Sequence, residues 1–90
     1  MNMKYKVLLK RGAAKYLASL DKPTESRILS ALDGLAMIPP RGDIATMQGM
    51  RGFFRLRVGG YRAIFTIDDK EKAIYIQAIG PRGDVYKKRD

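Results

Sequence analysis

Hydrophobic and polar residues alternate over residues 53–65, in the sequence FFRLRVGGYRAIF, and this alternation predicts a β-hairpin. The glycines at 59–60 supply the positive backbone dihedral angles that a two-residue turn needs. With this turn, Arg57 pairs with Arg62, and Arg55 lies on the same side of the hairpin. The opposite side is apolar and consists of Phe54, Leu56, Val58, Tyr61, Ala63 and Phe65.

Hydrophobic spacing predicts the remaining elements. A short apolar run at residues 5–9 indicates a strand, and apolar residues at helical spacing indicate helices over 13–20 and from Pro23 to about Met37. The glycine-containing segment 41–52 is predicted to be a loop. The predicted strands after that loop are 53–58, 61–67 and 73–79.

The pattern of elements is therefore β-α-α-β-β-β in a single domain over residues 1–90, of the α+β class. We expect an N-terminal strand, an antiparallel helix pair, a three-stranded antiparallel sheet and a short basic tail after Pro81. An apolar helix pair needs a sheet face to cover, and the apolar face of the hairpin meets that need. The arginine face is then expected to stay open to solvent.

The net charge of the chain indicates which classes of molecule it is expected to bind. Lys and Arg total 18 against 9 Asp and Glu, giving a net charge of +9 and a pI near 10.1. Such a balance favours a nucleic acid first, an acidic protein second and an anionic membrane surface third.

The chain lacks both cysteine and histidine. This excludes a disulfide framework, a thiolate nucleophile, a cysteine-based metal site and a histidine general acid or base. No run approaches the roughly 20 apolar residues of a membrane span, and the N-terminus does not resemble a signal peptide. We therefore expect a cytoplasmic protein that uses no metal or other cofactor and binds no membrane.

The three arginines of the hairpin favour an anion site. Like charges directly opposite each other destabilise a sheet, and residues 53–65 contain no carboxylate to offset Arg57 and Arg62. A guanidinium is always charged and its planar fork matches a phosphate. The alternative is a solvated polar face without function.

A second group of candidate residues follows the last predicted strand. Arg82 and Tyr86 are expected near the edge of the sheet, where a tyrosine can stack on a base or bond a ribose hydroxyl. The alternative for Tyr86 is packing on the protein's own core. Lys87 and Lys88 are expected to attract the phosphate backbone rather than take part in chemistry.

Three blocks of the chain resemble the RelE branch of the RelE/ParE toxin superfamily. They are MRGFFRLRVGGYRAIF at 50–65, IGPRGDVY at 79–86 and PRGD at 40–43. The resemblance covers nearly the whole chain and implies the toxin of a type II toxin–antitoxin pair. It implies a ribosome-dependent endoribonuclease that cleaves mRNA in the A site, inhibits translation and needs no metal. It also implies two partners, the ribosome and a cognate antitoxin held in a hetero-oligomer.

The resemblance also assigns roles to residues. The family's reaction uses the 2′-OH beside the scissile phosphate as nucleophile and leaves a 2′,3′-cyclic phosphate. Its catalytic positions fall on Arg62, Arg82 and Tyr86, and its basic strand positions fall on Arg55 and Arg57, which we assign to RNA phosphate together with Lys87 and Lys88. The best-known member has lysines where Arg55 and Arg57 stand, and an arginine cannot serve as general base.

Two other readings of the same fold remain open. A ParE-like protein would inhibit DNA gyrase by protein–protein contact without cleaving RNA. A non-catalytic RNA-binding module would use the same basic face.

Overall fold

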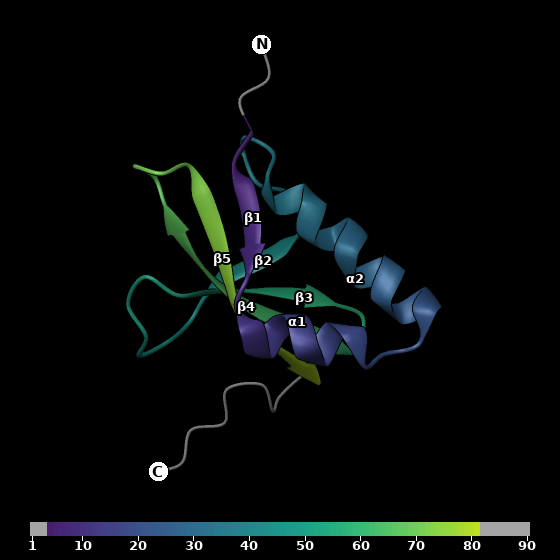
Figure 1. Ribbon diagram of the computed structural model, residues 1–90. Coiled ribbons are helices and arrows are strands. Elements are labelled where there is room, and N and C mark those ends of the chain that lie inside the picture. Colours follow the sequence, from purple (N-terminus) through teal and green to yellow (C-terminus); the bar gives the residue numbers. More distant parts are fainter. Residues whose placement is uncertain (1–3, 82–90) are drawn as a thin grey trace.

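The computed structural model describes residues 4–81, which form two helices and one five-stranded sheet (Figure 1). The strands are β1 (Lys6–Leu9), β2 (Asp43–Thr46), β3 (Phe54–Val58), β4 (Tyr61–Asp68) and β5 (Ala73–Pro81), and the helices are α1 (Arg11–Ala18) and α2 (Lys22–Leu35). The strand order across the sheet is β1-β5-β4-β3-β2. The predicted α+β class is confirmed.

The hairpin of β3 and β4 has the predicted register. Arg57 lies opposite Arg62, and Arg55 lies opposite Ile64. Gly59 has a φ of 58° at the turn, in the left-handed region that glycine adopts without steric cost. The rings of Phe54 and Phe65 stack on the apolar side with centroids 5.5 Å apart.

The sheet extends the three predicted antiparallel strands on both sides. β4 pairs antiparallel with β5, and β1 pairs parallel with the far side of β5. A parallel neighbour requires a long crossover connection, and the chain between β1 and β5 contains both helices. β1 and β5 are far apart in the sequence, so their pairing is a tertiary feature of the fold.

β2 corrects the prediction that residues 41–52 are a loop. Its four residues pair antiparallel with β3, which places Asp43 opposite Arg57. Gly42 lets the strand begin here, because its φ is +131° and a Cβ atom at this position would lie 2.6 Å from Leu56 Cδ1. Four residues at a sheet edge, flanked by glycines, give too short a periodic pattern for a prediction from the sequence.

The helices follow their local sequence signals. Asp21 caps α2, where its carboxylate accepts the Thr24 backbone N–H at 3.2 Å and the Thr24 hydroxyl at 3.0 Å. Pro23 lies in the first turn of α2, as predicted, and the helix ends at Leu35, before the expected Met37. The chain turns back between the helices, which diverge from that turn as they cross the sheet (Figure 1).

Both helices cover the same face of the sheet, as predicted. Ala13 and Leu17 of α1 and Ile28, Leu32 and Leu35 of α2 pack in one cluster with the apolar side of the sheet. The sheet contributes Leu56, Val58, Ala63, Phe65, Ile74, Ile76 and Ile79 to this cluster. Neither helix within residues 4–81 is long and apolar enough to cross a lipid bilayer.

Candidate nucleic-acid interface

Arg55, Arg57 and Arg62 lie on the sheet face that the helices leave uncovered. Arg57 and Arg62 are direct cross-strand partners, so both side chains leave the same side of the sheet. Arg55 is two residues from Arg57 on β3 and shares that side. None of the three belongs to the core beneath the helices. The predicted arginine face is therefore confirmed as a structural feature.

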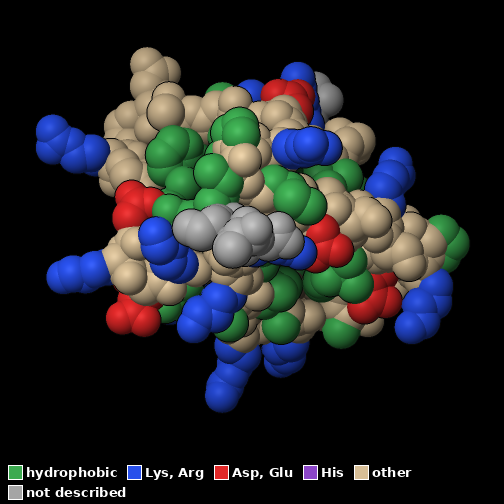
Figure 2. Space-filling view, turned by 90° about the horizontal axis from the view of Figure 1, so that it is seen from above, with side chains coloured by type: hydrophobic (Ala, Val, Ile, Leu, Met, Phe, Trp, Pro, Cys, Tyr) green, Lys and Arg blue, Asp and Glu red, His purple; other side chains and the backbone are tan. Residues whose placement is uncertain are grey.

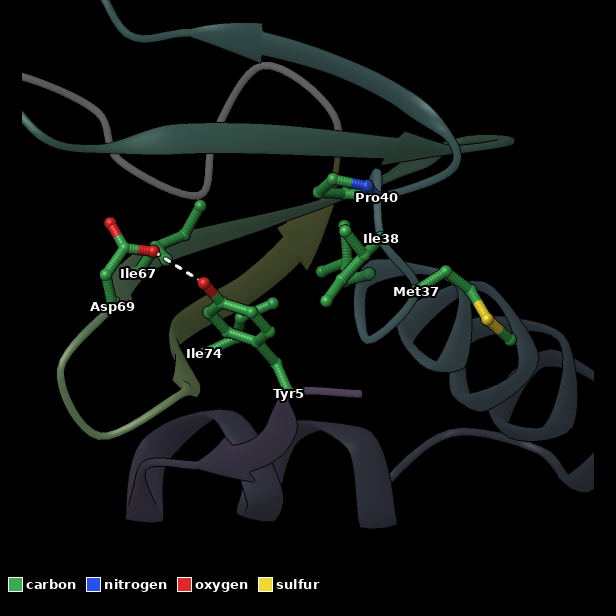
Figure 3. Close-up of a pocket in the computed structure, with 8 residues that line it drawn as sticks. Tyr5, Met37, Ile38, Pro40, Ile67, Asp69 and Ile74 are labelled. Carbon is green, nitrogen blue, oxygen red and sulfur yellow. Dashed lines mark hydrogen bonds between the residues drawn. The ribbon is translucent and has the colours of Figure 1, made fainter. Parts of the chain in front are cut away.

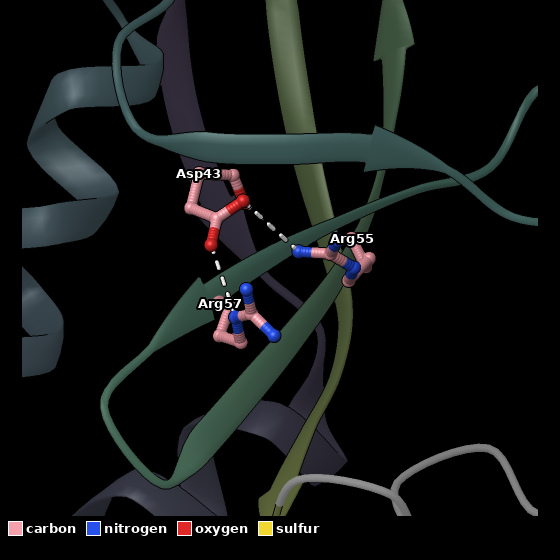
Figure 4. Close-up of polar contacts among 3 residues, drawn as sticks. All are labelled: Asp43, Arg55 and Arg57. Atoms are coloured by element: carbon pink, nitrogen blue, oxygen red, sulfur yellow. Dashed lines mark hydrogen bonds and ion pairs between the residues drawn. The ribbon is translucent and has the colours of Figure 1, made fainter.

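Asp43 joins this face from β2, and sequence reasoning missed it. Its Oδ2 accepts the Arg57 Nε–H at 3.0 Å, and its Oδ1 lies 3.5 Å from an Arg55 terminal nitrogen (Figure 4). The same Arg55 nitrogen donates to the Asp43 backbone carbonyl at 3.1 Å. Residues 53–65 contain no carboxylate, as the sequence shows, but Asp43 on a strand outside the hairpin offsets part of the arginine charge.

The carboxylate is held in its charged form. The hydrogen bond from Arg57 lowers the pKa of Asp43, and the positive charge of Arg57 and the contact with Arg55 act in the same direction. Partial burial acts in the opposite direction and is second in size to the Arg57 hydrogen bond, but the net effect is a lowered pKa. At neutral pH the cluster therefore combines one negative and three positive charges, a local excess of positive charge.

Many donors of the cluster remain available. Arg57 bonds Asp43 through Nε alone, so within the described chain its two terminal nitrogens have no hydrogen-bond partner. Arg62 Nε is buried and finds no partner among residues 4–81. A buried donor without a hydrogen-bond partner costs folding free energy, which sets Arg62 apart from an ordinary surface arginine.

The arginine face is less open than the sequence suggested. The Arg57 side chain is 41% exposed, but that of Arg55 is only 20% exposed. Ile64 is opposite Arg55 on this face and is fully buried. The cluster thus sits partly sheltered from water, which strengthens its electrostatic interactions relative to a fully exposed surface.

On the arginine face, charged side chains give way to uncharged ones along β4. Beyond Ile64 a register shift in the β4–β5 pairing indicates a bulge, and Gln77 donates to the Thr66 hydroxyl at 3.0 Å. These side chains are polar but uncharged. The guanidinium groups are therefore concentrated near the start of β4, at the turn end of the hairpin.

Arg82, Tyr86, Lys87 and Lys88 lie outside the described residues, so their placement stays a prediction. The end of β5 bears on it, because Gly80 pairs with Arg62 and Pro81 with Tyr61. The last described residue therefore lies beside the arginine cluster. Within residues 4–81, no group of three or more His, Cys, Asp or Glu side chains is arranged to hold a metal ion.

A pocket of about 170 Å³ lies away from the arginines, between the C-terminal end of α2 and the far ends of β4 and β5 (Figure 3). Its walls are mainly apolar, from Leu35, Met37, Ile38, Pro40, Ile67 and Ile74. At its rim the Tyr5 hydroxyl donates to Asp69 Oδ1 at 2.7 Å, and this bond raises the pKa of Tyr5.

Basic side chains are also found outside the cluster. In Figure 2, Lys and Arg side chains project around the visible face, with hydrophobic side chains gathered between them. The net charge of +9 therefore produces a broad positive field in addition to the local one.

The chain is similar to known toxins in sequence and in structure. Residues 7–86 match the sequence model of the ParE toxin of the type II toxin–antitoxin system parDE. A search of curated proteins found no significant match. Among solved structures, the archaeal RelE–RelB complex from Pyrococcus horikoshii contains a chain of 34% identity with a TM-score of 0.76, covering 91% of this chain and 99% of that one.

Two further structures show the same fold. The RelBE2 toxin–antitoxin complex of Mycobacterium tuberculosis has 25% identity and a TM-score of 0.76, over 91% of this chain and 95% of that one. The isolated Escherichia coli RelE toxin has 17% identity and a TM-score of 0.72, over 96% and 87% respectively. The chain therefore belongs to the ParE toxin family of type II toxin–antitoxin systems, within the RelE/ParE superfamily, and is a toxin of the RelE type.

Proposed function

We propose that this toxin is a ribosome-dependent endoribonuclease that cleaves mRNA in the A site and thereby inhibits translation. The observation that carries the proposal is the convergence of Arg55, Arg57 and Arg62 on one partly sheltered sheet face. The unpartnered donors of Arg57 and Arg62 suit a phosphodiester, which accepts hydrogen bonds and carries negative charge.

The reaction proposed is an internal transfer of the phosphoryl group. The 2′-oxygen attacks phosphorus, the bond from phosphorus to the 5′-oxygen breaks, and the products are a 2′,3′-cyclic phosphate and a 5′-hydroxyl. Charge grows on the phosphoryl oxygens during attack, and Arg62 is assigned to stabilise it. Arg55 and Arg57 hold the phosphate before and during the reaction, and Lys87 and Lys88 bind the backbone.

Proton transfer is assigned to residues other than the strand arginines. A guanidinium is a donor without acceptor capacity, so Arg55 and Arg57 are not bases. We propose that Tyr86 activates the 2′-OH and that Arg82 stabilises the leaving 5′-oxygen. Placement of the mRNA by the ribosome contributes through positioning, which also explains why the nuclease depends on the ribosome.

One specific observation favours a second candidate function. The matching sequence model is that of ParE toxins, so inhibition of DNA gyrase by protein–protein contact is the alternative. This alternative assigns no role to the free donors of Arg57 and Arg62, whereas RNA cleavage uses both. We therefore favour the nuclease.

The similarity to solved toxin structures also indicates a binding partner for this chain. Solved structures of related toxins contain them bound to RelB antitoxins, which supports a cognate antitoxin for this chain. We propose that the toxin is held in a toxin–antitoxin hetero-oligomer in the cytoplasm until it is released to the ribosome.

Mapping mRNA 5′ ends after incubating the purified protein with translating ribosomes tests the proposal. Cuts at A-site codons, lost in Arg62→Ala and retained in Lys15→Ala, are expected. Lys15 is the matched control because it is an exposed cation on α1, on the opposite face of the sheet. Gyrase-dependent DNA breaks without mRNA cuts would establish the ParE-like alternative, and ribosome binding without cuts would establish a non-catalytic module.

A further inference from the structure

We propose that Asp43 is a positioning residue that orients Arg57 and Arg55 for the scissile phosphate. Asp43, Arg57 and Arg62 form one row across β2, β3 and β4, because Asp43 pairs with Arg57 and Arg57 pairs with Arg62. A single carboxylate at the end of this row faces two neighbouring guanidiniums. The inference rests on the proposed nuclease function and adds a residue to it.

The hydrogen bonds of Asp43 indicate that it orients the arginines and does not only neutralise their charge. A carboxylate that neutralises an arginine usually binds both donors of the fork, which leaves fewer donors for a ligand. Here the two oxygens are divided, with Oδ2 on Arg57 Nε at 3.0 Å and Oδ1 near Arg55 at 3.5 Å (Figure 4). Arg57 is therefore fixed at the base of its guanidinium group, while both terminal nitrogens stay free for an anion.

The cross-strand neighbour explains why such an anchor is needed. Without a restraint, the like charges of Arg57 and Arg62 would drive the two side chains apart across the strands. The Asp43 carboxylate supplies the negative charge that lowers the cost of placing Arg57 opposite Arg62, and it fixes Arg57 while it makes no bond to Arg62. Such preorganisation is what the stabilisation of a charged transition state requires.

The same contacts argue against Asp43 as the general base. Both of its oxygens face guanidinium groups, and the hydrogen bond from Arg57 makes the carboxylate a weaker proton acceptor. Asp43 also begins an edge strand directly after Gly42, where the backbone fixes its position. Its contribution is expected through Arg57 and Arg55, without direct contact with the RNA.

Single-turnover cleavage on programmed ribosomes, measured as a function of toxin concentration, tests the role. Asp43→Asn keeps the shape but replaces one oxygen with a donor that faces an arginine. The maximal rate is expected to fall about 10- to 100-fold, as for a displaced catalytic group, while the half-saturating concentration changes by a smaller factor. Asp43→Glu should recover part of the rate, and Asp33→Asn, which removes an exposed carboxylate from α2, should match the wild type.

A spectroscopic measurement isolates the positioning step. In the wild type the Arg57 Nε–H signal in nitrogen-15 spectra should exchange slowly with water, and in Asp43→Asn it should exchange faster while the backbone spectrum is retained. An unchanged Arg57 signal, an unchanged maximal rate, or a pH–rate profile that loses its acidic limb in Asp43→Asn overturns the positioning role. Absence of cleavage by the wild type instead overturns the proposed nuclease function, so the two failures are distinguishable.

Discussion

Arg57 and Leu56 are neighbours on β3 with opposite environments, and their side chains are expected to contribute to opposite properties. Leu56 is 1% exposed in the core, and truncation to alanine should cost about 2–5 kcal/mol of unfolding free energy. Arg57 loses a surface ion pair on truncation but also its repulsion from Arg62, so Arg57→Ala should change stability by less than about 0.5 kcal/mol. Urea unfolding of both variants checks this. A large loss in Arg57→Ala alone would mean that the strand faces are reversed.

Arg62 should matter more for turnover than for binding. Charge develops on the phosphoryl oxygens only as the 2′-oxygen attacks, so a donor aimed at those oxygens acts mainly in the transition state. Arg62→Ala is expected to lower the single-turnover rate on saturated ribosomes about 100-fold or more. Ribosome affinity should change much less. Wild-type turnover in the bound variant would remove Arg62 from the catalytic residues.

Tyr86→Phe distinguishes two roles for the tyrosine that follows β5. If its hydroxyl handles the 2′-OH proton, cleavage should slow about 100-fold, the lower range for general acid–base catalysis. If the ring only stacks on a base, Tyr86→Phe should be nearly neutral and Tyr86→Ala harmful. Single-turnover cleavage of both variants, with ribosome binding measured separately, gives the answer.

At the scale of elements, β2 depends on Gly42. A Cβ atom there would approach Leu56 Cδ1 to 2.6 Å at a φ of +131°, so Gly42→Ala should cost about 1–3 kcal/mol and displace Asp43. Gly49→Ala is the control, because its φ of +79° is also positive but its Cβ would meet open space. Denaturant unfolding of the two variants separates the clash from the dihedral strain. Equal losses would show that the contact with Leu56 is unimportant.

The cap of α2 should give stability a specific dependence on pH. The Thr24 hydroxyl, followed by its N–H, lowers the pKa of Asp21 in the folded protein. A lowered pKa stabilises the fold above the unfolded value of about 3.9 and loses this contribution as the pH falls through the folded value. Asp21→Asn keeps a capping oxygen but does not titrate, so its stability should fall less between pH 6 and pH 2. Parallel urea midpoints for both proteins would contradict this.

The elements differ in how far the sequence predicts them. The β3–β4 hairpin was predicted in register because alternation and the turn glycines are local signals that agree. The sequence does not predict that β1 lies beside β5, because parallel pairing between distant segments leaves no local pattern. β2 was missed because four residues beside glycines do not reveal a period.

The residues of the candidate site also differ in how far the sequence predicts them. The hairpin predicted Arg55, Arg57 and Arg62 together, because cross-strand register follows from the turn. Asp43 reaches them only through the pairing of β2 with β3, so reasoning within the hairpin had no access to it. The sequence does contain a signal, since Asp43 closes the block at 40–43 that resembles the family, but the glycines of residues 41–52 predict a loop there.

At the scale of the whole molecule, two levels of positive charge have different consequences. The arginine cluster acts over a few ångströms, through directed donors on one sheet face. The net charge of +9 acts over the distance that salt allows, and basic side chains project around the face seen in Figure 2. The broad field should set how fast the protein meets a polyanion, and the cluster should set what happens after contact.

The rate of association with purified ribosomes should therefore depend steeply on salt. As the Debye length shortens from about 30 Å at 0.01 M to about 8 Å at 0.15 M, the association rate should fall roughly tenfold or more. Lys15→Gln and Arg57→Gln each remove one charge, from opposite faces of the sheet, and should lower this rate by similar small factors. Of these two substitutions, only Arg57→Gln should also raise the dissociation rate, because Arg57, unlike Lys15, belongs to the proposed contact surface. Stopped-flow measurements at several ionic strengths give both rates, and an association rate independent of salt would show that the docking surface is not the positive one.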